Sequence, residues 1–206
     1  MSNGRLIRWC KDIGMFAFDL PIAKTCRYRT KFCNDTCYNN KFYRMYHHSM
    51  PTGDAALWAF WQSVTAEQFV SLIRRKRKPI NRFRFCTRGD IFYSKESIDK
   101  VAEILKLLPG TLFWIPTRAW RKDPIREYIE RTIMPLPNAR LQASIDPSNT
   151  VMEIAAISRW PKMFYGDDSA KHMGTKCPKT WEGKKAECAS CEVGCFNNFN
   201  VHLKQH

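Results

Sequence analysis

The middle of the chain alternates between two spacings of its apolar residues. In residues 81–86 (NRFRFC) the phenylalanines occupy every second position, which is the period of a half-buried β-strand. In residues 94–110 (SKESIDKVAEILKLLPG) the apolar positions lie three and four apart, which is the period of an amphipathic helix. Ser94 is a suitable N-cap for this helix, and Pro109 followed by Gly110 is a suitable stop. The pattern therefore predicts a strand followed at once by a helix.

The same order is repeated further along the chain. Residues 111–116 (TLFWIP) are a continuous apolar run with the length of a buried strand, and Asp123 followed by Pro124 is typical of a helix start. We expect residues 139–146 and 150–158 to form the next two strands. Strands that alternate with helices are the sequence form of right-handed βαβ units. We therefore predict an α/β fold, a reduced or partial (β/α) barrel with mostly parallel strands.

The remaining segments are expected to complete one domain over residues 1–206. Residues 52–78 read as two helical pieces, and the second opens with a capping box from Thr65 to Gln68. Near the C-terminus the stretch FNVHL is expected to form a short strand. The domain is expected to have three parts. Residues 1–50 form an N-terminal strand with a cysteine loop, and residues 51–160 form the βα repeats. Residues 161–206 form a C-terminal cysteine-rich knuckle packed on the domain.

Polar residues follow each expected strand. Ligands of parallel sheets gather at the carboxyl ends of the strands, so these residues are expected to meet on one rim. They are Cys86, Thr87, Arg88, Gly89, Asp90, Thr117, Arg118, Trp120, Ser144, Asp146, Ser158, Arg159 and Trp160. Arg88, Asp90, Arg118 and Asp146 are our candidate catalytic residues, in a site for an anionic or polar ligand. The alternative is that each residue is only a turn former or a cap.

Three cysteines near the N-terminus, Cys26, Cys33 and Cys37, follow the spacing C-x6-C-x3-C among basic and aromatic residues. The N-terminus lacks the apolar run of a signal peptide, so we expect reduced thiols that bind metal rather than disulfides. Three thiolates can hold a [4Fe-4S] cluster with one iron open to an outside ligand, or they can recruit a fourth ligand such as Cys86. Buried packing is the alternative for Cys86 and for Cys10. Weaker ligand candidates are His47, His48 and His202.

Four more cysteines lie close together near the C-terminus, with the spacing C-x10-C-x2-C-x3-C. They are Cys177, Cys188, Cys191 and Cys195. The two short gaps allow adjacent ligands, so these thiolates are expected to fold around a metal. Structural zinc and an iron–sulfur cluster both suit all-sulfur ligation, and scattered reduced thiols are the third reading.

The charge of the chain changes the picture of its partners. Its 34 Lys and Arg against 19 Asp and Glu give a net charge of +15, which favours a polyanion such as nucleic acid. A solvated basic surface is the alternative. Stacking of bases on Tyr38, Phe42, Tyr43 or Tyr46 would add to such binding. No apolar run is long enough to span a membrane, so we expect no membrane partner and a cytoplasmic location.

Several phrases of the sequence carry a family resemblance. DLPIAKTC followed by CNDTCYNNKFY, then RFRFCTRGDIFYSKESIDKV, LFWIPTRAW and LQASID, and the cysteine-rich ending with VHL, together resemble a family of phage proteins known as gene product 88. The resemblance covers nearly the whole chain in order. It implies a phage origin, and hence the cytoplasm of a host cell, but no particular reaction.

That family is in turn distantly similar to radical S-adenosylmethionine enzymes, which hold a three-cysteine [4Fe-4S] cluster on a loop before the second barrel helix. Cys37 followed by Tyr38 matches the aromatic that often follows the last cysteine there, whereas the gaps of six and three residues depart from the usual three and two. The resemblance implies S-adenosylmethionine as a further cofactor. A barrel class of transglycosylases that exchange bases in nucleic acid is a second likeness, in which Asp90 or Asp146 would be nucleophile or base.

The leading hypothesis from the sequence is a phage iron–sulfur protein that acts on or near nucleic acid. Its [4Fe-4S] cluster would be bound by the three N-terminal cysteines, and the four C-terminal cysteines would bind metal close by. The competing hypothesis is a nucleic-acid-binding protein without catalysis, in which zinc is a structural staple and the rim arginines contact phosphate.

Overall fold

The computed structural model describes residues 6–166, 174–183, 188 and 190–204. These residues contain an eight-stranded open sheet with the order β1-β2-β3-β4-β5-β6-β8-β7, in which only the β1–β2 pair is antiparallel. The strands are β1 (Arg8–Cys10), β2 (Met15–Phe18), β3 (Arg82–Phe85), β4 (Leu112–Thr117), β5 (Ala139–Ile145), β6 (Lys162–Gly166), β7 (Thr175–Lys176) and β8 (Val201–Lys204). The predicted α/β class with mostly parallel strands is confirmed.

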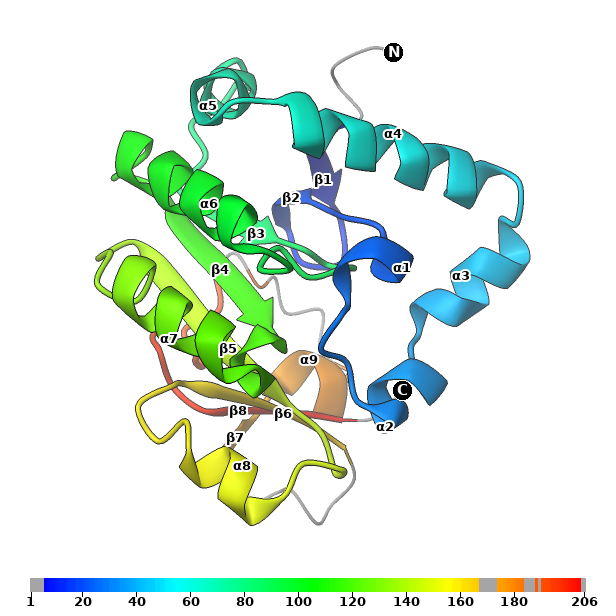
Figure 1. The fold of residues 1–206 in the computed structure, drawn as a ribbon, viewed down its shortest axis with the longest axis vertical. Coiled ribbons are helices and arrows are strands. Elements are labelled where there is room, and N and C mark those ends of the chain that lie inside the picture. Colours follow the sequence, from blue (N-terminus) through cyan, green and yellow to red (C-terminus); the bar gives the residue numbers. More distant parts are fainter. Residues whose placement is uncertain (1–5, 167–173, 184–187, 189, 205–206) are drawn as a thin grey trace.

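The helices that connect successive parallel strands cover one face of the sheet (Figure 1). They are α5 (Ala66–Arg74), α6 (Lys95–Leu107), α7 (Asp123–Thr132) and α8 (Val151–Ala155). A long helix, α4 (Ser49–Ser63), precedes α5, and the predicted capping box from Thr65 to Gln68 is present. Each strand from β2 to β5 pairs with the next one in the chain, which is the strand order of a (β/α) barrel.

The main core lies between the sheet and these helices. Phe83 and Phe85 of β3 both point into it and are fully buried, as the alternating pattern predicts. The ring of Phe69 in α5 stacks on Phe85 with centroids 5.9 Å apart, and Phe85 stacks on Phe113 of β4 at 5.6 Å. Burial of such rings is the largest apolar contribution that a side chain makes to folding. The aromatic stack therefore fixes β3 and β4 against the helix layer.

A second, smaller core lies on the opposite face of the sheet. Trp114 of β4 and Phe196 meet there with ring centroids 6.1 Å apart, together with Met15 and Cys10 near the N-terminus. The C-terminal segment that carries Phe196 thus packs on the sheet, and it also adds β6, β7 and β8 to the sheet. Cys10 is buried in this core, which agrees with the packing alternative.

Two expectations about the elements were wrong or incomplete. Residues 150–158 were expected to be a strand, but they contain helix α8, which Thr150 and Glu153 open with a capping box. The strand that follows β5 is instead β6, which the sequence reading did not single out. The described strands form an open sheet, so closure of a barrel is not shown.

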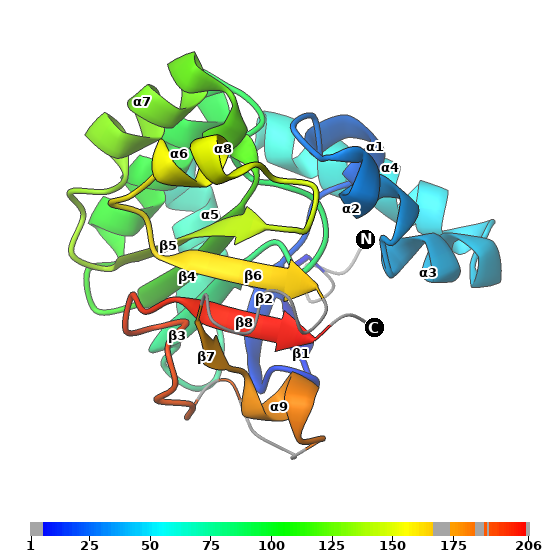
Figure 2. The ribbon, with the colours of Figure 1, turned by 90° about the horizontal axis from the view of Figure 1, so that it is seen from below.

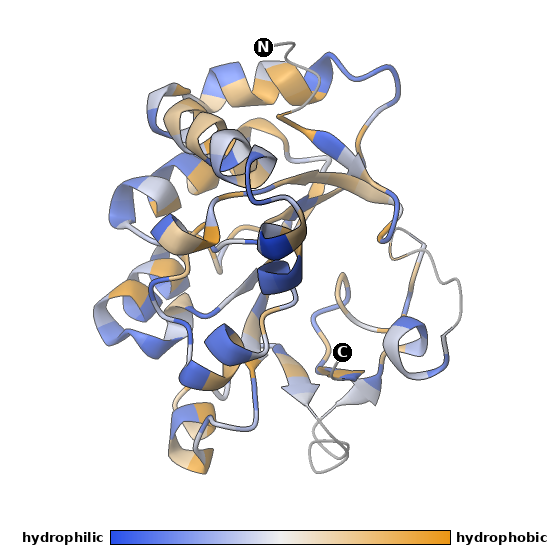
Figure 3. Cartoon of the chain, turned by 90° about the vertical axis from the view of Figure 1, so that its right-hand side faces the viewer, coloured by the Kyte–Doolittle hydropathy of each residue, from blue (hydrophilic) through white to orange (hydrophobic). Residues whose placement is uncertain are grey.

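The segment after β2 forms a separate group of short helices at the carboxyl ends of the strands. It contains α1 (Ile22–Thr25), α2 (Lys31–Asp35) and α3 (Asn39–Met45). Figure 2 shows the arrows of β6 and β8 pointing toward the side on which these helices lie. Seen from that side, the ribbon mixes hydrophilic and hydrophobic stretches (Figure 3). In the parts of the chain that the structure describes, no helix combines the length and apolar composition that crossing a bilayer requires.

Candidate metal centres

The three N-terminal cysteines lie in the helical segment after β2, which we call the cysteine loop (residues 19–48). Cys26 directly follows α1, Cys33 lies inside α2, and Cys37 lies between α2 and α3. All three side chains are partly exposed. The hydroxyl of Thr30 accepts a hydrogen bond of 2.9 Å from the backbone N–H of Cys33, so Thr30 caps α2. The helix that carries Cys33 is therefore defined by its own N-cap.

The thiols of the cysteine loop influence one another electrostatically. Burial, the nearby Asp90 carboxylate and the neighbouring thiols of Cys33 and Cys37 raise the pKa of Cys26 to about 12. Burial also raises the pKa of Cys33, while the guanidinium of Arg118 acts against that shift. The thiols of Cys26 and Cys33 are therefore protonated at neutral pH in the absence of metal. A bound cation would reverse this, because coordination deprotonates a thiol.

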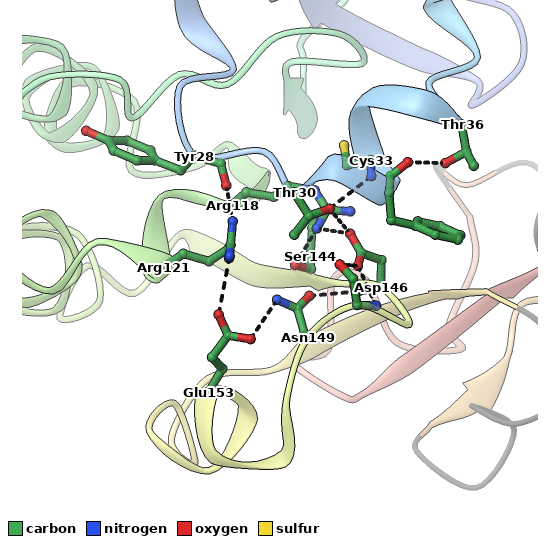
Figure 4. A network of polar contacts seen from close by, with 12 residues as sticks. Tyr28, Thr30, Cys33, Thr36, Arg118, Arg121, Ser144, Asp146, Asn149 and Glu153 are labelled. Carbon is green, nitrogen blue, oxygen red and sulfur yellow. Dashed lines mark hydrogen bonds and ion pairs between the residues drawn. The ribbon is translucent and has the colours of Figure 1, made fainter.

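Asp146 and Arg118 fasten this loop to the sheet. The Arg118 guanidinium lies 2.7 Å from the carboxylate of Asp146, whose side chain is fully buried, and the same carboxylate accepts a 2.6 Å hydrogen bond from the Thr30 hydroxyl. Figure 4 shows the three side chains meeting beside α2. Burial alone would raise the pKa of Asp146, but Arg118 and hydrogen bonds from Ser148 and Thr30 hold it below its usual value. The end of β5 thus holds the N-cap of the helix that carries Cys33.

A second tether joins the loop to the β5–β6 crossover. The Arg121 guanidinium donates a 3.0 Å hydrogen bond to the carbonyl of Tyr28 and lies 3.3 Å from the carboxylate of Glu153 in α8. Figure 4 shows this chain of contacts beside the Asp146 cluster. The loop is therefore held at two points by arginines that follow β4.

Asp90, which follows β3, also fastens the cysteine loop to the sheet. It is buried, and burial raises its pKa although it accepts hydrogen bonds of 2.9 Å from the Thr117 hydroxyl and from the backbone N–H of Arg118. Its own backbone N–H donates to the hydroxyl of Thr25, the residue before Cys26. Asp90 therefore links the ends of two strands to the first cysteine of the loop.

Arg88 and a residue that the sequence reading missed, Asp19, fix the outer part of the loop. Arg88 forms an ion pair with Asp54 of α4, and Tyr43 of α3 donates to the same carboxylate. Asp19 follows β2 and accepts hydrogen bonds from the backbone N–H and the hydroxyl of Thr87, at 2.7 and 2.8 Å. A carboxylate directly after an apolar strand run was the available signal for Asp19.

The expected rim is therefore present in part. Arg88, Asp90, Arg118 and Asp146 do lie at the carboxyl edge of the sheet, but each is bonded to neighbouring protein groups. The three residues after the expected fourth strand do not join them, because that segment is a helix. Arg159 instead lines a pocket with Ala139, the first residue of β5, at the other end of the sheet.

The four C-terminal cysteines form a second group, on the opposite face of the sheet from the main core. Cys188 and Cys195 pack against the second core. Burial, followed by the neighbouring thiols of Cys177, Cys188 and Cys191, raises the pKa of Cys195 to about 12. The backbone N–H of Cys177 donates a 2.8 Å hydrogen bond to the carbonyl of His202 in β8.

The sulfurs are gathered but do not converge. Among the described residues, no group of three or more His, Cys, Asp and Glu side chains is arranged to hold a metal ion. Metal binding at either group would therefore require the thiols to move toward a common centre.

The other ligand candidates lie in different settings. Cys86 follows β3 with a φ of 59°, a left-handed conformation that non-glycine residues seldom adopt, and it is buried in the main core. Its pKa is raised well above the usual value by burial, then by Asp19, Asp90 and Cys26. His47 and His48 are exposed, with ring centroids 4.1 Å apart. His202 is buried beside the Trp181 ring.

Comparison with known proteins gives a single result. The family model described as gene product 88 matches residues 2–192. No curated protein and no solved structure matches the chain.

Proposed function

The chain belongs to the gene product 88 family, and on that premise we propose that it is a metalloprotein whose cysteine loop binds a [4Fe-4S] cluster and which acts on or near nucleic acid. Cys26, Cys33 and Cys37 would each bind one iron. The fourth iron would stay open to an outside ligand, and S-adenosylmethionine is the ligand that the resemblance to radical enzymes implies. Cys177, Cys188, Cys191 and Cys195 would hold a second centre, of iron and sulfide or of zinc.

The position of the cysteine loop carries this proposal. The loop follows the first strand of a run of parallel strands and lies at their carboxyl ends, where α/β proteins place their ligands. Buried polar contacts from the ends of β3, β4 and β5 hold it there. In this reading the open sheet is a reduced (β/α) barrel, and the cluster occupies its mouth.

The surface of the cysteine loop supports nucleic acid as the partner. Between residues 24 and 48 the chain exposes six cations and has one acidic residue, Asp35, which is paired with Lys31. The exposed cations are Lys24, Arg27, Arg29, Lys31, Lys41 and Arg44. Tyr38 and Tyr46 are about half exposed beside them, at 47% and 50%. Cations interleaved with exposed aromatic rings suit the backbone and bases of a single strand.

Anaerobic purification tests the cluster. We expect a brown protein that contains iron and acid-labile sulfide and gives a paramagnetic resonance signal on reduction. Replacing Cys26, Cys33 and Cys37 by Ala should remove the part of the signal that belongs to the cluster of the cysteine loop, and Cys10→Ala is the matched control that should retain the whole signal. A change of the signal on adding S-adenosylmethionine would identify the open iron. Protein that stays colourless after reconstitution with iron and sulfide contradicts the proposal.

One observation favours a second candidate, a nucleic-acid-binding protein without catalysis whose thiols bind zinc. Arg88, Asp90, Arg118 and Asp146 all make ion pairs or hydrogen bonds inside the fold, so each has a structural role without any substrate. The same contacts weigh against a transglycosylase in which Asp90 or Asp146 is the nucleophile. A colourless, zinc-loaded protein that retards single-stranded DNA on a gel would favour this candidate.

A further inference from the structure

A run of basic residues leads from the end of α5 toward the start of β3. Residues 74–78 have the sequence RRKRK, and no acidic residue occurs between Glu67 and Asp90. Four of the five side chains are exposed, and Lys76 is partly exposed. Among the described residues, none of the five forms an ion pair with a carboxylate. The run is therefore a concentrated positive charge that the fold itself leaves uncompensated.

The position of the run at a helix end explains only part of it. Arg74 donates a 3.0 Å hydrogen bond to the carbonyl of Leu107, the last residue of α6. Cations near the end of α5 also offset the helix dipole, but this effect fades beyond the last turn. Arg77 and Lys78 lie past the end of α5, which is at residue 74. These two charges therefore have no structural role of that kind.

Lys76 joins the basic run to an exposed tryptophan on the edge strand β1. Its ammonium donates a 2.9 Å hydrogen bond to the carbonyl of Ile7 and lies 5.3 Å from the centre of the Phe16 ring. Phe16 is the β2 partner of Trp9, and the two rings meet edge to face with centroids 5.2 Å apart. Trp9 is nevertheless 53% exposed. A large flat ring is thus held beside the basic run with much of its surface open to solvent.

This pair of features is separate from the surface of the cysteine loop. The exposed rings assigned there, Tyr38 and Tyr46, flank α3. Figure 1 shows α5 and α2 at opposite ends of the view. Cations and an exposed aromatic ring therefore occur together at a second place on the molecule, which we call the Trp9 surface (Trp9 and residues 74–78).

We propose that the Trp9 surface is a second binding surface for single-stranded nucleic acid. The exposed cations of the run contact phosphates, and one base stacks on the exposed part of the Trp9 ring. A single strand fits this surface better than a duplex, because its bases are free to stack on protein rings. The inference shares its class of partner with the proposed function. It adds a place of contact, however, and needs no metal centre.

The salt dependence of binding tests the phosphate contacts. The full chain is titrated into labelled oligothymidylate and oligouridylate at several salt concentrations, and fluorescence anisotropy gives the affinity. Each phosphate contact with a single strand contributes about 0.7 to the slope of log affinity against log salt. We therefore expect R75A/R77A/K78A, which removes three exposed cations, to lower the magnitude of this slope by about 2. The variant retains Lys76 and its contacts with Ile7 and Phe16.

The matched control removes three exposed cations from the helix layer. K95A/K122A/R131A has the same net charge as the test variant, so it shows what the loss of charge alone does. We expect its slope to stay close to that of the wild type. Urea unfolding of both variants shows that they are folded.

Trp9→Ala tests the stacking. We expect it to weaken binding by about 5- to 150-fold, the range for one stacked base, and to leave the salt slope unchanged because a stacked base releases no counterion. Trp9→Phe keeps a smaller ring and should bind with intermediate affinity. It provides the test if the alanine variant does not fold.

The outcomes separate this inference from the proposed function. If R75A/R77A/K78A has the same slope as the control, or if both Trp9 variants bind like the wild type, the Trp9 surface is overturned while the cysteine loop can still bind nucleic acid. If K24A/K41A/R44A in the cysteine loop binds like the wild type and the test variant does not, the Trp9 surface is kept and the loop is overturned as a contact. A wild type that binds neither oligonucleotide overturns both, whereas its iron content still tests the cluster.

Discussion

The two cysteine-bearing regions are attached to the same sheet in different ways. The cysteine loop is held by side chains, and its main contacts reach across the sequence from Asp146 to Thr30 and from Asp90 to Thr25. The C-terminal segment is held by the backbone pairing of its strand β6 with β5 and by the packing of Phe196 on Trp114. A few buried polar groups thus place the first region, while pairing and apolar contact place the second. Substitutions should therefore affect one region without affecting the other.

The largest effect is expected for Asp146→Ala. This change removes one partner of a buried pair and leaves the Arg118 guanidinium without its counter-charge, which costs about 3–5 kcal/mol of the free energy of unfolding. It also frees Thr30 at the start of α2. Urea unfolding measures the loss, and iron content reports on the cysteine loop. Cobalt binding at the C-terminal cysteines should persist in the folded fraction. Equal loss at both regions would show that they are not independent.

A smaller effect is expected for Thr30→Ala. The N-cap of α2 and one hydrogen bond to Asp146 are lost, but the Arg118–Asp146 pair remains. We expect a loss of about 1–2 kcal/mol in unfolding free energy. Thr30→Ser, which keeps the hydroxyl, is the matched control for urea unfolding. A serine variant as unstable as the alanine variant would show that the hydroxyl is not the group that matters.

Trp181→Phe is the counterpart of Thr30→Ala in the C-terminal region. Trp181 lies in α9 (Pro178–Trp181), and its indole N–H donates a 3.0 Å hydrogen bond to the carbonyl of His202. Phenylalanine keeps most of the ring and loses the donor, so we expect a loss of about 1 kcal/mol in unfolding free energy. The iron signal of the cysteine loop should be unchanged, and a change in it would break the comparison.

The smallest effect is expected in the way the free energy of unfolding depends on pH. The pKa of Asp146 is lower in the folded chain than its ordinary value of 3.8, so its contribution is fully present above that value and is lost as the pH falls below it. As the pH is lowered from 5, the free energy of unfolding measured in urea should therefore decrease less steeply in Asp146→Asn than in the wild type. Identical slopes would show that Asp146 does not contribute to the acid sensitivity.

The sequence predicts the elements with a clear period and the edge of the sheet at which the cysteine loop lies. The strands at 82–85 and 112–117 and helix α6 were found in this way. The run from residue 150 to 158 is short and apolar, so its period is ambiguous, and the capping box of Thr150 and Glu153 was the signal that identifies a helix.

The partners of the rim residues could not be predicted in the same way. Thr30 and Asp146 are 116 positions apart, and nothing in either local pattern records that they meet. The same residues fit a substrate site and a structural clamp, because an aspartate and an arginine after a strand serve both. Only the fold distinguishes these roles.

The sequence separation of Thr30 and Asp146 also determines when their contact can form during translation. A ribosome adds about 5–20 residues each second, so the 116 residues between the two partners take roughly 6–23 s to synthesise. For most of that interval the three N-terminal thiols have already been translated, while Asp146, which holds the N-cap of α2, has not. Under the proposed function, insertion of the cluster and oxidation of the thiols would compete at the nascent chain before the Thr30–Asp146 contact is complete.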